Sequence, residues 1–105
     1  MTEVVLILTT VPDDGAGETL ARTLVEERLA ACVNVLPPMT SIYRWRGAVE
    51  HDSERQLVVK TTRHQIGAVR ERIAQLHPYE LPELLVLDVI DGSPGYLDWV
   101  RTETR

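Results

Sequence analysis

The sequence has few cysteines, no long apolar run and no surplus of positive charge, and each absence excludes a class of protein. Its one cysteine, Cys32, cannot form a disulfide within the chain. The apolar run near the N-terminus, residues 4–8, is too short for a secretory signal or for a membrane span, which needs about 20 apolar residues. The formal net charge of −5 at pH 7 argues against a general nucleic-acid binder. We therefore expect a cytoplasmic protein that binds neither nucleic acid nor membrane.

The length and composition are those of one folded domain over residues 1–105. Hydrophobic residues make up 44% of the 105 residues and charged residues 26%, which is ordinary for a globular protein. No internal repeat or low-complexity segment is present, and no shift of composition marks a linker. These proportions exclude a disordered, collagen-like or coiled-coil chain.

Short apolar runs alternate with segments of helical periodicity, and turn-forming residues separate them. We expect Asp13 or Asp14 to cap the first helix, and Thr62 and Gln65 to form a capping box at the start of the second. Pro94 is typical of the first position of a closing helix. The expected elements are strands at 4–8, 31–35, 41–46, 49–61 and 84–89, and helices at 16–29 and 62–76 and from 94.

The segment 41–61 has the pattern of a β-hairpin. A two-residue turn at 47–48, with glycine in its first central position, would place Trp45 opposite Glu50 and Tyr43 opposite Asp52. Strand alternation puts the two aromatic side chains on one face of the hairpin.

The order of elements predicts an α+β fold, the ferredoxin-like βαββαβ sandwich with an extra C-terminal helix. Two helices can cover only one face of such a sheet. The runs 4–8 and 84–87 are nevertheless apolar at both odd and even positions. The second face must therefore be buried against something else, most simply other copies of the chain.

Candidate ligand residues are few. Cys32 and the histidines at 51, 64 and 77 show no spacing typical of a zinc site. The segment 77–83 is more unusual, because two prolines hold an imidazole, a phenol and two carboxylates between a helix and a strand. Two interpretations stay open for this segment, a rigid connector and a binding loop. Lys60, the single lysine, is either a solvated or ion-paired strand residue or a ligand-binding group.

Five segments together resemble the CutA divalent-cation-tolerance family, and they span almost the whole chain in order. The resemblance implies a ferredoxin-like subunit in a tight cytoplasmic homotrimer with a PII-like architecture. It also implies a role in tolerance of copper and other divalent metals, with no established enzymatic activity and no obligatory cofactor. The five segments are Ala30-Ala31-Cys32-Val33-Asn34, Ser41-Ile42-Tyr43-Arg44-Trp45-Arg46-Gly47, Val59-Lys60-Thr61, the loop from His77 to Glu83, and Gly92 to Trp99.

The sequence departs from the family at the positions proposed to bind copper in some members. Those members use a cysteine at the end of the first strand and paired histidines before the Pro-Tyr motif. Thr9, Leu76 and His77 stand at the corresponding positions here, so only the final histidine matches. The metal ligands implied for this chain are His77 and, beside it, the carboxylate of Glu80, which suit Cu(II) or another divalent cation bound weakly.

The leading hypothesis is a trimeric CutA-like protein that responds to or binds divalent metal ions and is not an enzyme. A second hypothesis is a PII-like sensing module that binds an anionic metabolite in clefts between subunits. Tyr43, Trp45, Lys60, Tyr79 and Glu83 are its candidate cleft residues. A third hypothesis is an adaptor whose closing helix presents aromatic side chains to partners.

Overall fold

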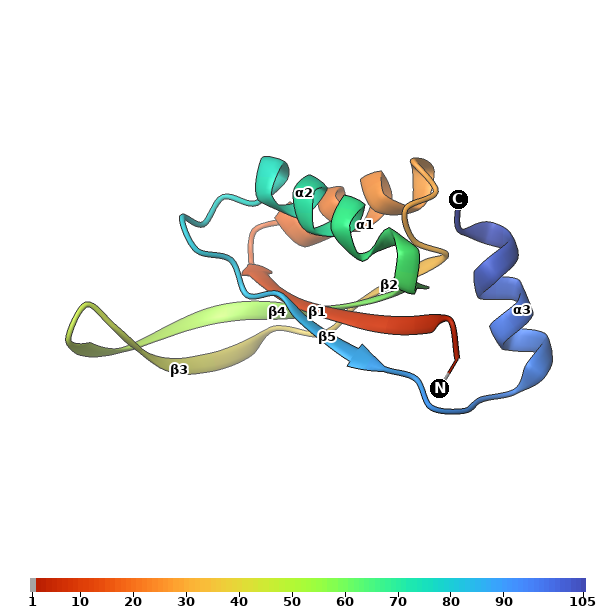
Figure 1. Ribbon diagram of the computed structural model, residues 1–105. Helices are drawn as coiled ribbons and strands as arrows, with labels where there is room; N and C mark the ends of the chain where they lie inside the picture. The colour runs from red at the N-terminus through yellow and green to blue at the C-terminus, as the bar shows by residue number, and fades with distance from the viewer. Residues whose placement is uncertain (1) are drawn as a thin grey trace.

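The computed structural model describes residues 2–105, which form an antiparallel sheet with two helices on one face and a third at its end (Figure 1). The α+β ferredoxin-like fold expected from the sequence is confirmed. None of the helices within this range is long and apolar enough to cross a membrane. The elements in chain order are β1 (Val4–Pro12), α1 (Ala16–Glu26), β2 (Cys32–Val35), β3 (Met39–Trp45), β4 (Ala48–Thr62), the 3-10 turn η1 (Arg63–Gln65), α2 (Ile66–Leu76), β5 (Leu85–Asp88) and α3 (Pro94–Glu103).

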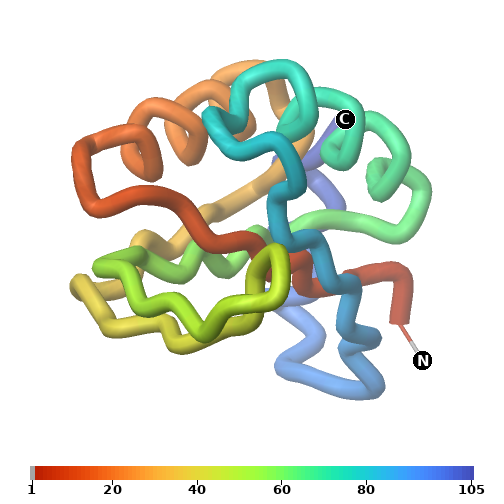
Figure 2. Tube along the Cα trace, turned by 90° about the vertical axis from the view of Figure 1, so that its left-hand side faces the viewer, coloured from red at the N-terminus to blue at the C-terminus, as the bar shows by residue number. Residues whose placement is uncertain are grey.

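The long strand β4 organises the sheet. The strand order is β2-β4-β1-β5, and β3 pairs with β4 as well, so β2 and β3 share one edge of the same 15-residue strand. The break between them falls at Pro37 and Pro38, because proline has no N–H to donate to a strand ladder. Beyond the helices, β3 and β4 continue as a long hairpin arm, which Figures 1 and 2 show from two directions.

The hydrophobic core lies between the sheet and the two helices. Ile7 and Val59 are directly opposite each other on β1 and β4, and both are fully buried. Leu24 of α1 and Ile73 of α2 belong to the same buried cluster. One apolar layer thus forms from every second residue of the strands and from helix residues three to four positions apart, as their periodicity predicts.

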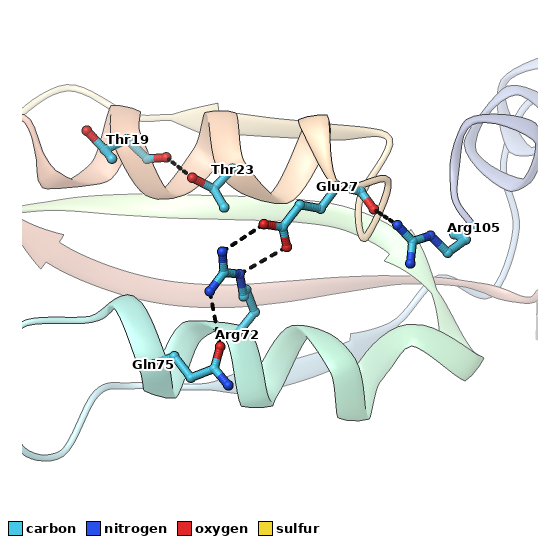
Figure 3. Close-up of polar contacts among 6 residues, drawn as sticks. All are labelled: Thr19, Thr23, Glu27, Arg72, Gln75 and Arg105. Atoms are coloured by element: carbon cyan, nitrogen blue, oxygen red, sulfur yellow. Dashed lines mark hydrogen bonds and ion pairs between the residues drawn. The ribbon is translucent and has the colours of Figure 1, made fainter.

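Helices α1 and α2 are also joined at the surface by one charged pair (Figure 3). Arg72 donates from Nε and Nη2 to the two carboxylate oxygens of Glu27, at 3.0 and 2.7 Å. This bidentate geometry is the strongest form of a charge-assisted hydrogen bond. It lowers the pKa of Glu27, chiefly through the hydrogen bond from Arg72.

Within the described part of the chain, the opposite face of the sheet has no helix layer over most of its area. Leu6 lies between Lys60 of β4 and Leu87 of β5, while Leu8 lies between Val58 and Leu85. Leu85 and Leu87 are 54% and 45% exposed. This open face confirms that the strands are apolar on both sides, as their periodicity indicates.

Helix α3 packs at the end of the sheet and covers only that end of the open face. Its Val100 forms a small buried cluster with Val4 and Ala31. Pro94 occupies the start of α3, as predicted, but the Ser93 side chain makes no capping hydrogen bond.

Some local predictions are wrong in detail: the position of the hairpin turn, the length of β1 and the helix caps. The hairpin turn is Arg46-Gly47 rather than 47–48, so Trp45 pairs with Ala48 and Tyr43 with Glu50. Both turn residues have positive φ, 48° and 82°, as a type I′ turn requires, and an arginine gives no sequence signal for that conformation. β1 is also longer than expected, because Thr9 to Pro12 continue to pair with β4.

The capping box at Thr62 and Gln65 does not form. A 3-10 turn replaces the first helical turn, and the Thr62 hydroxyl is buried without a hydrogen-bond partner among residues 2–105. Gln65 instead donates its amide to the carbonyl of Arg105. Arg105, which follows α3, therefore binds the Gln65 side chain that would have completed the cap. At α1 the N-cap residue is Gly15, at a φ of 91°, so neither candidate aspartate occupies the predicted cap. Asp14 stands one residue before it and accepts a hydrogen bond from the backbone N–H of Ala16 at 3.0 Å.

Candidate functional site

A groove of about 1100 Å³ lies between the β3–β4 hairpin and the loop 78–83 that follows α2. Pocket volumes near this size are typical of small-molecule sites. The hairpin and the end of β1 form one side, and the loop forms the other. Its lining residues are Thr10, Pro12, Ser41, Ile42, Tyr43, Trp45, Asp52, Ser53, Glu54, Pro78, Tyr79, Glu80, Leu81, Pro82 and Glu83.

His77 anchors the loop at its beginning. It ends α2 in an extended conformation, and its ring is buried, with 8% exposed. Its Nδ1 accepts a hydrogen bond from the Tyr79 backbone N–H at 3.1 Å, and its Nε2 lies 2.6 Å from the Thr10 carbonyl oxygen. An acceptor at Nδ1 and a donor at Nε2 make this a neutral imidazole. The histidine thus ties the loop to β1 with both of its nitrogens.

Tyr79 ties the middle of the loop to β4. Its hydroxyl donates to Oε2 of Glu54 at 2.6 Å, and Glu54 is only 7% exposed. Burial raises the pKa of Tyr79, and the bond to Glu54 raises it further, because an ionised phenol could not donate to a carboxylate.

Two further contacts complete the polar side of the groove. Tyr43 donates its hydroxyl to Asp52, and this bond raises the pKa of Tyr43 to about 12. Gln56 donates its amide both to Oε2 of Glu83, at 3.0 Å, and to the Thr9 carbonyl, at 2.7 Å. The end of the loop is therefore held to the same two strands as its beginning.

At the outer rim, the guanidinium of Arg46 lies 5.3 Å from the ring centre of Trp45 and 3.0 Å from Oε2 of Glu80. Both charged side chains are largely exposed, so this ion pair adds little stability. Trp45 is 39% exposed in the single chain. The loop that lines the groove with it belongs to its own chain, whereas the sequence-based prediction placed the cleft between subunits.

The groove is acidic. Among residues 2–105, its lining includes the carboxyl groups of Asp52, Glu54, Glu80 and Glu83 and no lysine, arginine or histidine; Arg46 reaches only its rim. An anionic ligand would meet four like charges there.

Most of the predicted cleft residues lie together, but Lys60 does not. Tyr43, Trp45, Tyr79 and Glu83 all line the groove, and so does Glu80, which is predicted as a metal ligand. Lys60 is six residues further along β4 than Glu54, which is about 20 Å of extended strand. Its ammonium lies 5.7 Å from the ring centre of Tyr96, on the open face between Leu6 and Cys32. Within one chain the cleft predicted with Lys60 is therefore not assembled.

The two predicted metal ligands do not converge within one chain. Both nitrogens of His77 are engaged, and Glu80 points to the rim, where it pairs with Arg46. No group of three His, Cys, Asp or Glu side chains able to hold a metal occurs within residues 2–105. His64 lies elsewhere, with Nε2 3.0 Å from the carbonyl oxygen of Arg105.

Sequence reasoning missed Asp52 and Glu54 as groove residues. They belong to a polar hairpin arm, and alternation along β4 places both on the face that carries Tyr43. This alternation can be predicted from the sequence, but the contact between Tyr79 and Glu54 cannot.

Comparison with known proteins gives a consistent result. Residues 5–103 match the family model described as CutA1 divalent ion tolerance protein. A divalent-cation tolerance protein CutA from Thermus thermophilus is 53% identical over 104 residues, with 99% of each chain covered. Among solved structures, Cut A1 from Thermus thermophilus superposes with a TM-score of 0.94 at 49% identity, covering 97% of this chain and 99% of that one. The PII-like protein CutA from Nostoc superposes with a TM-score of 0.90 at 42% identity, covering 96% and 97%.

Proposed function

The chain belongs to the CutA1 divalent ion tolerance family, and on that premise we propose that it acts in the divalent-cation response as a cytoplasmic homotrimer. In this proposal the protein is a single domain that binds ligands and is not an enzyme. The observation that carries the proposal is the open apolar face of the sheet. Leu6, Leu8, Val58, Leu85 and Leu87 form a contiguous surface without a helix layer.

The edge of the sheet supports the same proposal. β5 is the outermost strand beyond β1, so its outer backbone groups have no strand partner among residues 2–105. All four of its residues are exposed, and three of them are apolar. An uncovered apolar edge is an aggregation hazard, and natural proteins cover such edges. Burial between identical subunits covers the edge and the open face together.

Oligomeric mass tests the proposal directly. We expect light scattering at micromolar concentration to give about three times the chain mass of 11.8 kDa. Leu87→Glu places a charge on the open face and should shift the protein toward monomer. Val25→Glu is the matched control, because Val25 is 40% exposed on α1, in the other layer. A wild-type protein that stays monomeric would overturn the proposal.

For the metal, we propose that Cu(II) binds weakly to one chain and tightly only where subunits bring donors together. A metal at Nδ1 of His77 would displace the hydrogen bond from the Tyr79 N–H, and a metal at Nε2 would first require that nitrogen to give up its proton and its bond to Thr10. The role of His77 with Glu80 therefore stays a prediction. Copper titration of His77→Ala, with His64→Ala as control, tests it. If His77 is a ligand, its variant loses more affinity than the control, and wild-type affinity falls as pH drops through the histidine range. Equal affinities in all three proteins would remove His77 from the site.

The likeness to a PII-like protein supports small-molecule binding as the second candidate function. The expectation of an anionic metabolite needs revision, however, because the groove of a single chain carries four carboxyl groups and Lys60 lies outside it. An acidic groove selects for the opposite charge.

A further inference from the structure

The groove contains a carboxyl group that lacks a positive partner. Glu54 is 7% exposed, and among residues 2–105 its side chain receives one hydrogen bond, from the Tyr79 hydroxyl to Oε2. Oε1 receives no hydrogen bond in that range and is not fully buried, and none of the ion pairs there includes Glu54. The adjacent Arg55 is not available, since its Nε pairs with Asp13 at 3.1 Å. A buried carboxylate is costly unless a cation or several donors compensate it, so this position favours a positive ligand.

The walls around Glu54 suit an organic cation. Tyr43 and Trp45 are each 39% exposed and line the same groove as Tyr79. Aromatic faces attract ammonium and guanidinium groups, more strongly where water is excluded. Leu81, which is 71% exposed, and Pro82 add apolar surface for an alkyl stem.

The chain itself shows this recognition chemistry at the rim. Arg46 places its guanidinium over the Trp45 ring and against a carboxylate oxygen of Glu80. The contact combines an aromatic face with a carboxylate. The same two features occur deeper in the groove, where aromatic side chains line the walls around the Glu54 carboxylate. Arg46 itself stays at the surface, with 71% of its side chain exposed, and does not reach Glu54.

We infer that the groove between the hairpin and the loop 78–83 binds a small organic cation, an alkylguanidinium or alkylammonium, with its charge at Glu54 and its stem against the aromatic and apolar walls. A bare metal ion fits less well, because no three His, Cys, Asp or Glu side chains converge within residues 2–105. The inference deepens the ligand-binding candidate above by naming the ligand class. It rests on that candidate function and does not require the trimer.

Calorimetric titration with three matched probes tests the charge requirement. Butylguanidinium carries the proposed cation, butylurea has nearly the same shape without charge, and butyrate carries the opposite charge. We expect butylguanidinium to bind at least about tenfold more tightly than butylurea, because the buried carboxylate is paired only by the cation. Butyrate should give no measurable heat.

Charge-removing variants test the position. Glu54→Gln keeps an acceptor for the Tyr79 hydroxyl and should weaken butylguanidinium binding by at least about tenfold. Glu71→Gln removes the same charge from an exposed position on α2, outside the groove, and should leave affinity within about twofold. Tyr79→Phe breaks the same hydrogen bond but keeps the carboxylate, so it should preserve the preference for butylguanidinium over butylurea. That variant separates loss of charge from loss of loop structure.

Three results would overturn the inference. The first is no binding of butylguanidinium at millimolar concentration, which would include the case of a second copy's side chain already filling the groove. The second is equal binding of butylurea. The third is an equal loss of affinity in Glu54→Gln and Glu71→Gln. Light scattering on the same samples reports the oligomeric state separately, so a failed trimer and a failed cation site are distinguishable.

Discussion

Tyr79, in the loop after α2, donates its hydroxyl to Oε2 of Glu54, in the middle of β4, at 2.6 Å, and this contact joins the two sides of the groove. The two residues are 25 positions apart, and neither local structure requires them to meet. His77 positions Tyr79 for this contact, because it fixes the start of the loop against β1. The acidic groove thus depends on a loop tied to two strands.

Tyr79→Phe should destabilise the protein by about 1–3 kcal/mol, since it leaves a buried carboxylate without its donor. The folded-state pKa of Tyr79 is raised, so this stabilisation is complete below the unfolded value of about 10 and is lost as pH rises through the folded value. Urea denaturation at neutral and alkaline pH measures the difference. Tyr43→Phe is the comparison, because its partner Asp52 is exposed. A variant as stable as wild type at neutral pH would contradict the role of the bond.

Two glycines at the second position of their helices should respond oppositely to alanine. A Cβ on Gly17 would lie 2.8 Å from Cγ2 of Val11, a stiff side chain in the core. Gly17→Ala should therefore cost about 1–3 kcal/mol despite the better helix propensity of alanine. Gly67 has no atom within 4 Å of its added Cβ, so Gly67→Ala should be neutral or stabilise by up to about 1 kcal/mol. Thermal unfolding of both variants checks the prediction, and equal shifts would refute it.

The Arg72–Glu27 pair should make stability depend on pH in the acid range. The pKa of Glu27 is lowered by the bond from Arg72, so the pair stabilises the fold above the unfolded value of about 4.3. That contribution disappears as pH falls through the folded value. Glu27→Gln should therefore be less stable than wild type at pH 7, and the two should converge in acid. Glu26→Gln, on the exposed side of α1, should show no such convergence in thermal melts at several pH values.

Trp45 should be buried further when subunits assemble. It is 39% exposed in one chain, at the mouth of the groove. If the assembled subunits enclose it, Trp45→Ala lowers oligomer stability by more than about 2 kcal/mol, as for a buried aromatic anchor. Val49→Ala is the control, because Val49 is 65% exposed on β4, lies outside the lining of the groove and pairs with Arg44 on the opposite face of the hairpin from Trp45. Dilution monitored by light scattering gives the dissociation midpoints. Identical midpoints for Trp45→Ala and wild type would show that Trp45 only stacks on its own Arg46.

The sequence by itself determined the order of elements and the faces of the strands. Period-two alternation assigns Ile7 and Val59 to one face and Leu6 and Leu8 to the other, because successive side chains must point to opposite sides. Helical spacing identifies Leu24 and Ile73 as core residues for the same geometric reason. The motifs of the loop and the hairpin were sufficient for the resemblance to the CutA family, which the comparisons confirm.

Only the tertiary structure decided which polar side chains meet. The hairpin turn is one residue earlier than predicted and places Arg46 at positive φ, a conformation that its residue type does not indicate. Gln65 is drawn away from its predicted cap by the carbonyl of Arg105, a residue 40 positions later. Lys60 and Glu54 lie on the same face of one strand, yet only Glu54 faces the loop. Such contacts join segments distant in sequence, and local periodicity carries no information about how distant segments approach each other.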